Sequence, residues 1–250
     1  MKSSNILHNS LIMNGQLSKN GKKSDSASTL SGQQDEKLLE IILGNQRSAI
    51  DTPLRKDAFE MSNEEKIARI AEYMGKIMQT LGLDLTDESL RDTPMRVAKM
   101  YVRETFMGLD PANKPEATLF SNSYNYSQML VEKDITIYST CEHHLVPIIG
   151  KAHVAYFSND HVIGLSKLNR IADYYARRPQ VQERLTIQIA EALKEILKTD
   201  DVAVMIDASH LCVASRGIRD IKSSTVTTEY SGRFLNREIR NEFLSYLDKK

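Results

Sequence analysis

The chain contains only two cysteines, Cys141 and Cys212, and each lies within three residues of a histidine. Thiolate sulfur and imidazole nitrogen are the ligands that zinc prefers in proteins. Cys141 and His144 are spaced like the first ligand pair of many zinc sites, and Cys212 could supply a third ligand. A fold that uses all three residues must bring two distant segments of the chain together.

Two interpretations of this pattern are open. A structural zinc site is normally closed by four protein ligands, whereas three ligands leave a position for water. Three candidates without an obvious fourth therefore favour a catalytic site. In the alternative, the cysteines are small buried apolar residues and the histidines are ordinary core or surface residues.

Composition restricts the kind of protein. The 250 residues are 41% hydrophobic and 26% charged, which is ordinary for a globular protein. The 33 Lys and Arg residues balance the 33 Asp and Glu residues, so we expect no nucleic-acid partner and no attraction to an anionic membrane. No apolar run approaches the roughly 20 residues of a membrane span, and no secretory signal is evident. We therefore expect a cytoplasmic protein whose two thiols are reduced.

The N-terminal part divides into two predicted regions. Residues 1–57 are expected to be a disordered or weakly helical extension, because most of the segment is polar and lacks apolar periodicity. Residues 58–117 are expected to form a helical region. Ser62 and Glu65 fit a capping box that opens a helix ending at Gly82.

A second helix of this region is predicted to start at Thr93, with Pro94 in its first position, and to stop at Gly108. Its other face carries a basic stripe that contains Arg96 and Lys99. A solvated helix face is the usual explanation for such a stripe.

Residues 118–250 are expected to form the catalytic domain. Short alternating segments predict antiparallel strands on both sides of the Cys141 motif, with later helices capped by Ser166 and opened by Pro179. A buried strand then leads to His210, and would put His210 and Cys212 on one face if it stayed extended. The order of these elements predicts an α+β fold with an antiparallel sheet whose helices cover one face.

Charged side chains near the candidate metal ligands point to a polyanionic substrate. Lys167 and Arg170 lie near a predicted helix start, and Arg216 follows Cys212. Phosphates would explain cations gathered near a metal site in a chain of zero net charge. Glu183 could accept paired hydrogen bonds from a flat base such as guanine. It could equally be an acidic residue favoured by the dipole of a first helical turn.

Five motifs of the sequence form a recognisable set. They are Cys141-Glu142-His143-His144-Leu145, Val162-Ile163-Gly164-Leu165-Ser166-Lys167-Leu168, Arg178-Pro179-Gln180-Val181-Gln182-Glu183-Arg184-Leu185-Thr186, His210-Leu211-Cys212 and Arg216-Gly217. In order and with compatible spacing, from about Asn63 to Phe243, this set resembles the zinc-dependent GTP cyclohydrolase I family.

The resemblance implies conversion of GTP and water to 7,8-dihydroneopterin triphosphate and formate, the first step of folate and pterin biosynthesis. It also implies the tunnelling fold and a homodecamer of two stacked five-subunit rings, with active sites at subunit boundaries. Zn²⁺ would be the cofactor.

The resemblance also implies a role for each matched residue. Zinc falls on Cys141, His144 and Cys212. Acid–base roles fall on His143 and His210, with Ser166 assisting the sugar chemistry. Guanine recognition falls on Glu183 and neighbouring Gln182. Triphosphate binding falls on Lys167, Arg170 and Arg216, with Arg96 and Lys99 reaching phosphates from a neighbouring subunit.

Two other functions compete with this one. A non-catalytic, zinc-stabilised homologue that binds nucleotide or a partner would keep the fold, but it would not need His143, His210 and Glu183 beyond the metal ligands. A zinc nucleobase deaminase would show H-x-E followed by P-C-x-x-C, and the sequence has neither.

Overall fold

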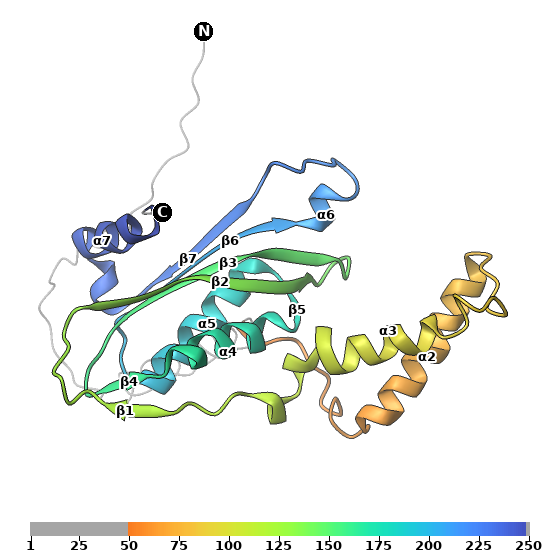
Figure 1. The fold of residues 1–250 in the computed structure, drawn as a ribbon, viewed down its shortest axis with the longest axis horizontal. Helices are drawn as coiled ribbons and strands as arrows, with labels where there is room; N and C mark the ends of the chain where they lie inside the picture. Colours follow the sequence, from red (N-terminus) through yellow and green to blue (C-terminus); the bar gives the residue numbers. More distant parts are fainter. Residues whose placement is uncertain (1–49, 249–250) are drawn as a thin grey trace, which may run out of the picture. The chain divides into compact units, whose positions relative to one another are not determined.

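The computed structural model describes residues 50–248. These residues belong to one compact unit, Gln46–Lys250, and Figure 1 shows their helices and strands. Most of the predicted extension, 1–57, lies outside the described residues, and the predicted boundary at residue 117 stays a prediction. Among residues 50–248, no helix is both long and apolar enough to cross a membrane.

Helix α2 spans Asn63–Thr80 and begins with the predicted capping box. The Glu65 backbone N–H donates to Ser62 Oγ over 3.2 Å, and the Ser62 N–H donates to Glu65 Oε2 over 2.9 Å. The chain leaves the helix through Gly82, whose φ of 85° lies in the left-handed region that glycine enters at little cost. Both predicted ends of this helix are confirmed.

Helix α3 spans Thr93–Met100 and starts one residue earlier than predicted. Asp92 is the N-cap, and Pro94 lies in the first turn, where its missing N–H would have had no partner. The α-helix is also shorter than predicted. A π-helical turn and two 3-10 turns follow it: η1 (Tyr101–Thr105), η2 (Met107–Leu109) and η3 (Pro111–Asn113).

Gly108, the predicted end of that helix, lies where the chain passes close to helix α4 (Leu165–Ala176). Its N–H donates to the Arg177 carbonyl over 3.0 Å. A Cβ at this position would overlap the Tyr174 carbonyl oxygen. The glycine is therefore required by the close approach of two backbones, and not only by the end of a helix.

The main sheet has five strands in the order β5-β2-β3-β6-β7. Its long strands are antiparallel, as predicted: β2 (Met129–Cys141), β3 (Pro147–Phe157), β6 (Val202–His210) and β7 (Thr225–Tyr230). The Cys141 motif lies in the turn between β2 and β3, as predicted. A separate two-stranded sheet pairs β1 (Leu119–Ser121) with β4 (His161–Ile163).

Two further predicted helix starts differ from the structure. The N-cap of α4 is Gly164, and Ser166 lies inside the first turn. Pro179 does not open a helix, because Pro179 and Gln180 form the short strand β5, parallel to the end of β2. The following helix, α5, begins only at Gln182 and spans Gln182–Leu197.

Helices α4 and α5 pack on one face of the sheet, as predicted, and Figure 1 shows them together on that side. At the end of the sheet away from Cys141, the other face is covered by η4 (Gly232–Leu235) and α7 (Arg237–Leu247), whose N-cap is Asn236. There Phe157, Phe234 and Phe243 form a second apolar cluster. The prediction that helices cover one face of the sheet therefore describes α4 and α5, whereas α7 packs on the opposite face.

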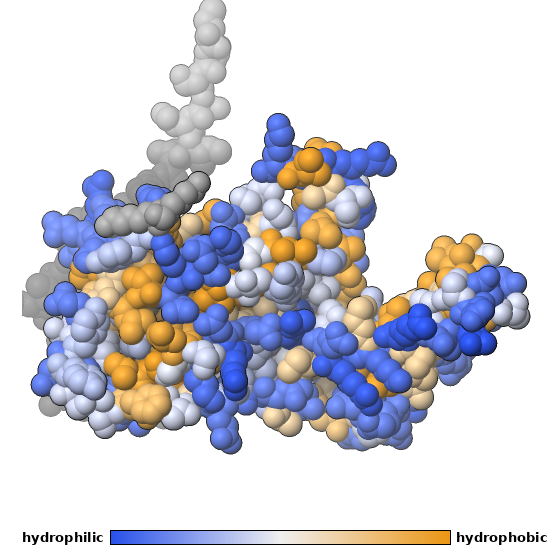
Figure 2. All heavy atoms as spheres, in the orientation of Figure 1, coloured by the Kyte–Doolittle hydropathy of each residue, from blue (hydrophilic) through white to orange (hydrophobic). Residues whose placement is uncertain are grey.

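Apolar side chains also remain at the surface. Figure 2 shows a hydrophobic cluster at the tip of the α2–α3 pair, where Leu81 is 72% exposed and Leu83 is 40% exposed. Contiguous exposed apolar surface commonly marks a protein–protein contact.

His153 in β3 makes a side-chain hydrogen bond to the neighbouring strand β2, and this bond should depend on pH. Its Nδ1 accepts a hydrogen bond from the backbone N–H of Asp134, at a bulge in β2 where Asp134 has a φ of 60°. Burial lowers the pKa of His153, against the opposing influence of the Asp134 carboxylate. Protonated Nδ1 could no longer accept this bond.

We therefore expect the free energy of unfolding to decrease as the pH falls below about 6.5, because the unfolded chain takes up this proton more readily. His153→Asn keeps an acceptor near the Nδ1 position but does not titrate. Urea unfolding at pH 7.5 and 5.5 should show a smaller loss of stability for the variant than for the wild type. An equal loss in both proteins would contradict this assignment.

Candidate metal centre and active site

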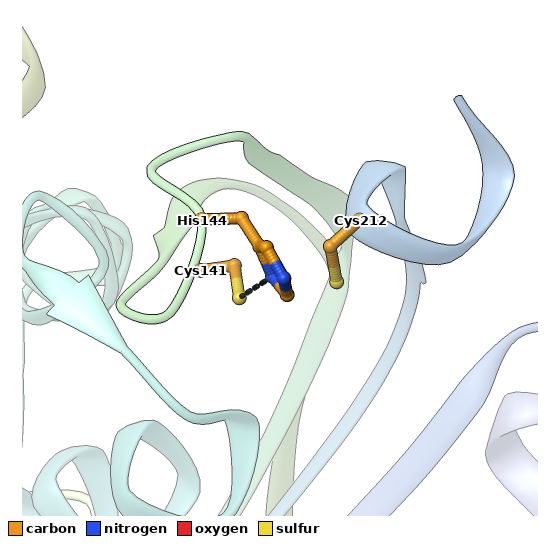
Figure 3. A group of neighbouring side chains, drawn as sticks. All are labelled: Cys141, His144 and Cys212. Atoms are coloured by element: carbon orange, nitrogen blue, oxygen red, sulfur yellow. Dashed lines mark hydrogen bonds between the residues drawn. The ribbon is translucent and has the colours of Figure 1, made fainter. Parts of the chain in front are cut away.

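The fold brings Cys141, His144 and Cys212 together at one end of the sheet (Figure 3). Cys141 ends β2, His144 lies in the β2–β3 turn, and Cys212 lies in the short helix α6 (Leu211–Ala214). The β3–β6 register pairs Ile148 with His210, so α6 starts beside the turn. Strand β6 ends at His210 instead of continuing to Cys212, so the condition for placing both residues on one strand face is not met.

The β2–β3 turn holds His144 close to Cys141. The Cys141 N–H donates to the Val146 carbonyl over 2.8 Å, and the Leu145 N–H donates to the Cys141 carbonyl over 2.9 Å. Leu145 has a φ of 52°, a left-handed conformation that is uncommon for a branched side chain. These two bonds close a tight loop with both candidate ligands on it.

The geometry of the three donors fits zinc. Their ligand atoms all lie within 4.8 Å of one another, and Cys141 Sγ is 3.8 Å from His144 Nδ1. Zinc at about 2.3 Å from sulfur and about 2.1 Å from nitrogen, in tetrahedral geometry, would separate those two atoms by about 3.6 Å. Among the described residues, no fourth His, Cys, Asp or Glu joins the group. The donor set therefore matches a centre with a position left open.

The two thiols influence each other. Burial raises the pKa of Cys212, and the neighbouring Cys141 raises it further, while the Arg216 guanidinium opposes this. A bound cation would reverse that balance, because metal ligation requires the thiolate. Arg216 Nη1 also lies 3.0 Å from His144 Nε2, so this predicted phosphate ligand is next to the metal group.

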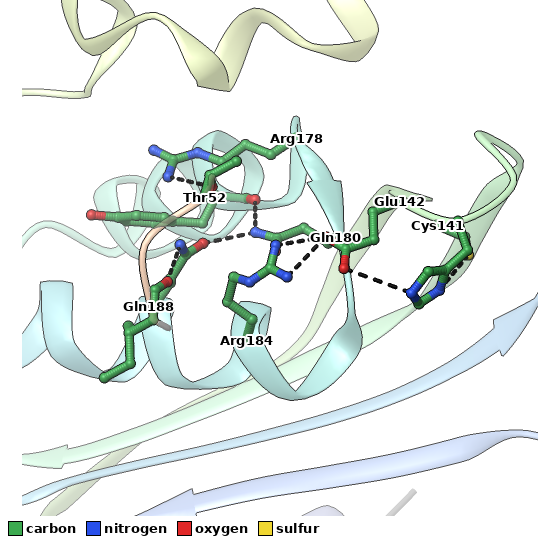
Figure 4. A network of polar contacts seen from close by, with 10 residues as sticks. Thr52, Cys141, Glu142, Arg178, Gln180, Arg184 and Gln188 are labelled. Atoms are coloured by element: carbon green, nitrogen blue, oxygen red, sulfur yellow. Dashed lines mark hydrogen bonds and ion pairs between the residues drawn. The ribbon is translucent and has the colours of Figure 1, made fainter. Parts of the chain in front are cut away.

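His143 lies beside the group with a largely exposed side chain. Its Nδ1 is 3.9 Å from Cys141 Sγ, and its Nε2 is 3.8 Å from Glu142 Oε1. The other carboxylate oxygen, Glu142 Oε2, accepts hydrogen bonds from both Nη atoms of Arg184, over 2.7 and 2.8 Å (Figure 4). The hydrogen bond with Arg184 lowers the pKa of Glu142, so its carboxylate stays ionised next to the imidazole.

Sequence reasoning gave neither Glu142 nor Arg184 a role. Both lie inside motifs that carry the family resemblance, and this position was the sequence feature that could have marked them as site residues. Their pairing across the fold could not be read from one sequence.

A buried glutamine pair extends the polar network behind the site (Figure 4). The Gln180 carbonyl accepts from the Glu142 N–H, and Gln180 Nε2 donates to Gln188 Oε1 over 2.7 Å. Gln188 Nε2 in turn donates to the Ile50 carbonyl over 2.7 Å. The segment that precedes α2 is thereby tied to the strand pair next to Cys141.

His210, the last residue of β6, is half-buried. Its Nε2 lies 2.7 Å from Gln182 Oε1. Burial lowers the pKa of His210, against the opposing charge of Glu183. Glu183 is exposed in the first turn of α5, whereas Gln182 beside it is only 1% exposed.

The remaining predicted site residues are not brought to the metal group. Ser166, Lys167 and Arg170 lie in the first turns of α4, and the other end of that helix leads to β5 beside Cys141. A helix of 12 residues is about 18 Å long. Ser166 and Lys167 therefore lie near the end of α4 that is farther from the metal group, and Arg170 lies about midway along the helix.

Arg96 and Lys99 are exposed on α3, which is also where the sequence placed them. The Arg96 guanidinium lies 3.7 Å from the carboxylate of Asp92, the N-cap of this helix. The predicted reach of Arg96 and Lys99 to a neighbouring subunit stays a prediction.

The sequence is similar to known proteins over most of its length. The family model for GTP cyclohydrolase I matches residues 70–248. The chain belongs to the GTP cyclohydrolase I family. GTP cyclohydrolase 1 of Flavobacterium johnsoniae is 62% identical over 195 residues, which are 78% of this chain and 87% of the relative. GTP cyclohydrolase 1 of Escherichia coli K12 is 55% identical over 196 residues, 78% of this chain and 88% of the relative.

Among solved structures, the archaeosine synthase QueF-Like in the apo form aligns with 43% of this chain and 97% of its own. The TM-score is 0.37 at 17% sequence identity. That likeness is too low to support any conclusion, so the family assignment depends on the sequence comparisons alone.

Removal of one sulfur ligand tests the metal centre. We expect Cys212→Ala, loaded with zinc and dialysed, to lose most of its bound zinc relative to the wild type, because two protein donors hold the ion far less tightly than three. His153→Asn is the matched control, since it changes a histidine outside the group. Elemental analysis per chain gives the measurement, and full zinc retention by Cys212→Ala would exclude this residue as a ligand.

Proposed function

We propose that this chain converts GTP and water to 7,8-dihydroneopterin triphosphate and formate at a zinc ion held by Cys141, His144 and Cys212. The family assignment supports the reaction. The observation that carries the site is the convergence of the three donors with two histidines beside them, His143 on the same turn and His210 at the end of β6.

Bound zinc would supply an activated water, because coordination lowers the pKa of water to about 7. The chain's own residues handle the protons. His143, exposed beside the metal group, exchanges a proton with the purine ring as the imidazole ring of GTP opens. His210 acts on the ribose side. Because burial lowers the pKa of His210, its imidazole is neutral near pH 7 and ready to accept a proton.

Glu183 recognises the guanine base. Its exposed carboxylate at the start of α5 can accept two hydrogen bonds from the N1–H and the 2-amino group of guanine. Charge-assisted bonds of this kind are short and directional. The side chain of Gln182, which the resemblance also assigns to guanine, is buried and already bonded within the chain.

The triphosphate is bound by Lys167, Arg170 and Arg216, with Arg96 and Lys99 from a neighbouring subunit. In a single protomer, Lys167 lies near the end of α4 that is farther from the metal group and Arg170 lies about midway along it, whereas Arg216 lies beside His144. Assembly of several copies would bring complementary sets together, so this separation supports a homodecamer with active sites at subunit boundaries. The exposed apolar tip of the α2–α3 pair supports contact between copies.

We further propose a cytoplasmic location. Both candidate sulfur ligands are free cysteines in the structure, and zinc ligation requires that they stay reduced. Reduced thiols are maintained in the cytosol.

Turnover of GTP tests the function and the guanine contact together. The zinc-loaded chain should release formate from GTP and yield a pterin that fluoresces after oxidation, and a chelator should stop both. Glu183→Gln should lower kcat/KM for GTP by about 10- to 100-fold, since a hydrogen bond to a charged group contributes about 1.5–3 kcal/mol. Its zinc content should be unchanged.

Two results would count against these assignments. Zinc-loaded wild-type chain that releases neither formate nor pterin would favour a non-catalytic, nucleotide-binding homologue. Wild-type kcat/KM in Glu183→Gln would remove this residue from guanine recognition while leaving the reaction itself intact.

A further inference from the structure

Gln182 is a polar residue buried in the interior of the protein. It is 1% exposed, at the first position of α5, yet its amide makes four close polar contacts. A buried amide without partners would cost about 1–3 kcal/mol, so the contacts explain how the residue is tolerated. They also determine which way the amide points.

The amide nitrogen is surrounded by acceptors. Gln182 Nε2 donates to the Thr225 carbonyl over 2.8 Å, to the Ile206 carbonyl over 3.1 Å and to Thr227 Oγ1 over 3.1 Å. Backbone carbonyl oxygens can only accept hydrogen bonds. The nitrogen must therefore face β6 and β7. If the amide were flipped, Gln182 Oε1 would lie against the carbonyl oxygens of Ile206 and Thr225, and none of these three atoms could donate a hydrogen bond.

The hydroxyl next to this amide is consistent with that orientation. Thr186 Oγ1 donates to the Gln182 backbone carbonyl over 2.8 Å, which uses its only proton. The 2.6 Å contact between Thr186 Oγ1 and Thr227 Oγ1 then has Thr227 as its donor. Thr227 Oγ1 is left as an acceptor for Gln182 Nε2, so every proton in this cluster has a partner.

The opposite end of the amide meets His210. Gln182 Oε1 lies 2.7 Å from His210 Nε2, and an amide oxygen can only accept. His210 Nε2 must therefore carry the proton in this contact, which leaves Nδ1 with a free lone pair when the ring is neutral. The ring is held at one nitrogen by a partner that is itself held by two strands.

We propose that Gln182 is a positioning residue for His210: it holds the imidazole in place and keeps its proton on Nε2, so that Nδ1 is the nitrogen that exchanges protons with the substrate. This inference depends on the proposed GTP reaction and on the part of His210 in it. In this proposal the Gln182 side chain positions His210 and does not contact guanine. Glu183 alone binds the base.

The two roles for Gln182 make opposite kinetic predictions. Gln182→Met keeps the size of the side chain but removes the acceptor for His210. If Gln182 acts through His210, kcat for GTP should fall about 10- to 100-fold, because a misplaced acid–base group forfeits part of its contribution of about 10²–10⁴. KM should stay within about threefold of the wild type. Direct guanine contact predicts the reverse, a raised KM with kcat retained.

A double-mutant cycle separates positioning from a general structural effect. In a His210→Ala background, Gln182→Met should change the residual kcat by less than about threefold, since its target is gone. His153→Asn is the control: it changes a buried polar side chain of β3 outside the site, and its kcat and KM at pH 7.5 should match the wild type. Should Gln182→Met fail to fold, Gln182→Ala supports the same cycle, because it also removes the acceptor for His210.

Equal losses of kcat in the wild-type and His210→Ala backgrounds would overturn the inference, as would a raised KM with normal kcat. Unchanged kcat in Gln182→Met, measured against a wild-type chain that turns over GTP, would overturn the inference alone. Absence of turnover in the wild type would overturn the proposed function and this inference with it.

Discussion

The hydrogen-bonded ladder between β3 and β6 is the constraint on which the site depends. It pairs Ile148 with His210 at one end and Tyr156 with Val202 at the other, so the start of α6 has one possible neighbour, the β2–β3 turn. A slip of one residue would turn every side chain of β6 to the other face and would carry Cys212 away from Cys141. Gly150 lies in this ladder at a point where a Cβ would overlap the Asp207 carbonyl oxygen.

Polar side chains buried behind the ladder give the site its orientation. Arg184 keeps Glu142 ionised next to His143, and Gln182 faces His210 with its oxygen. Such groups are costly to bury unless each is bonded, so a cluster in which every proton has a partner has few alternative arrangements. Apolar packing of α4 and α5 on the sheet stabilises the fold, whereas these polar contacts decide which atoms face a substrate.

Sequence patterns predicted the elements whose signals are local. The capping box at Ser62 and the end of α2 at Gly82 are each set by residues that touch their own turn. The prediction for Pro179 was wrong because a non-local pairing with Thr140 draws the chain into a strand. A proline has the same fixed φ in both settings, so its own signal could not distinguish them.

The site shows the same division. Ligand chemistry and spacing made Cys141, His144 and Cys212 candidate ligands from the sequence alone, because few residue types bind zinc. The pairing of Glu142 with Arg184, and the saturation of the Gln182 amide by β6 and β7, depend on register between distant segments. The position of the cations on α4 relative to the metal group could not be predicted from the sequence either, because it depends on which end of α4 lies near β5.

The central claim is a zinc centre with two sulfur ligands, a single imidazole and an open position, in which His144 binds the ion and His143 does not. X-ray absorption at the zinc edge of the zinc-loaded chain tests it most directly. The account predicts two sulfurs at about 2.3 Å and two nitrogen or oxygen ligands at about 2.0–2.1 Å, of which one is an imidazole. Fewer than two sulfurs, or a second imidazole in the first coordination sphere, would contradict it.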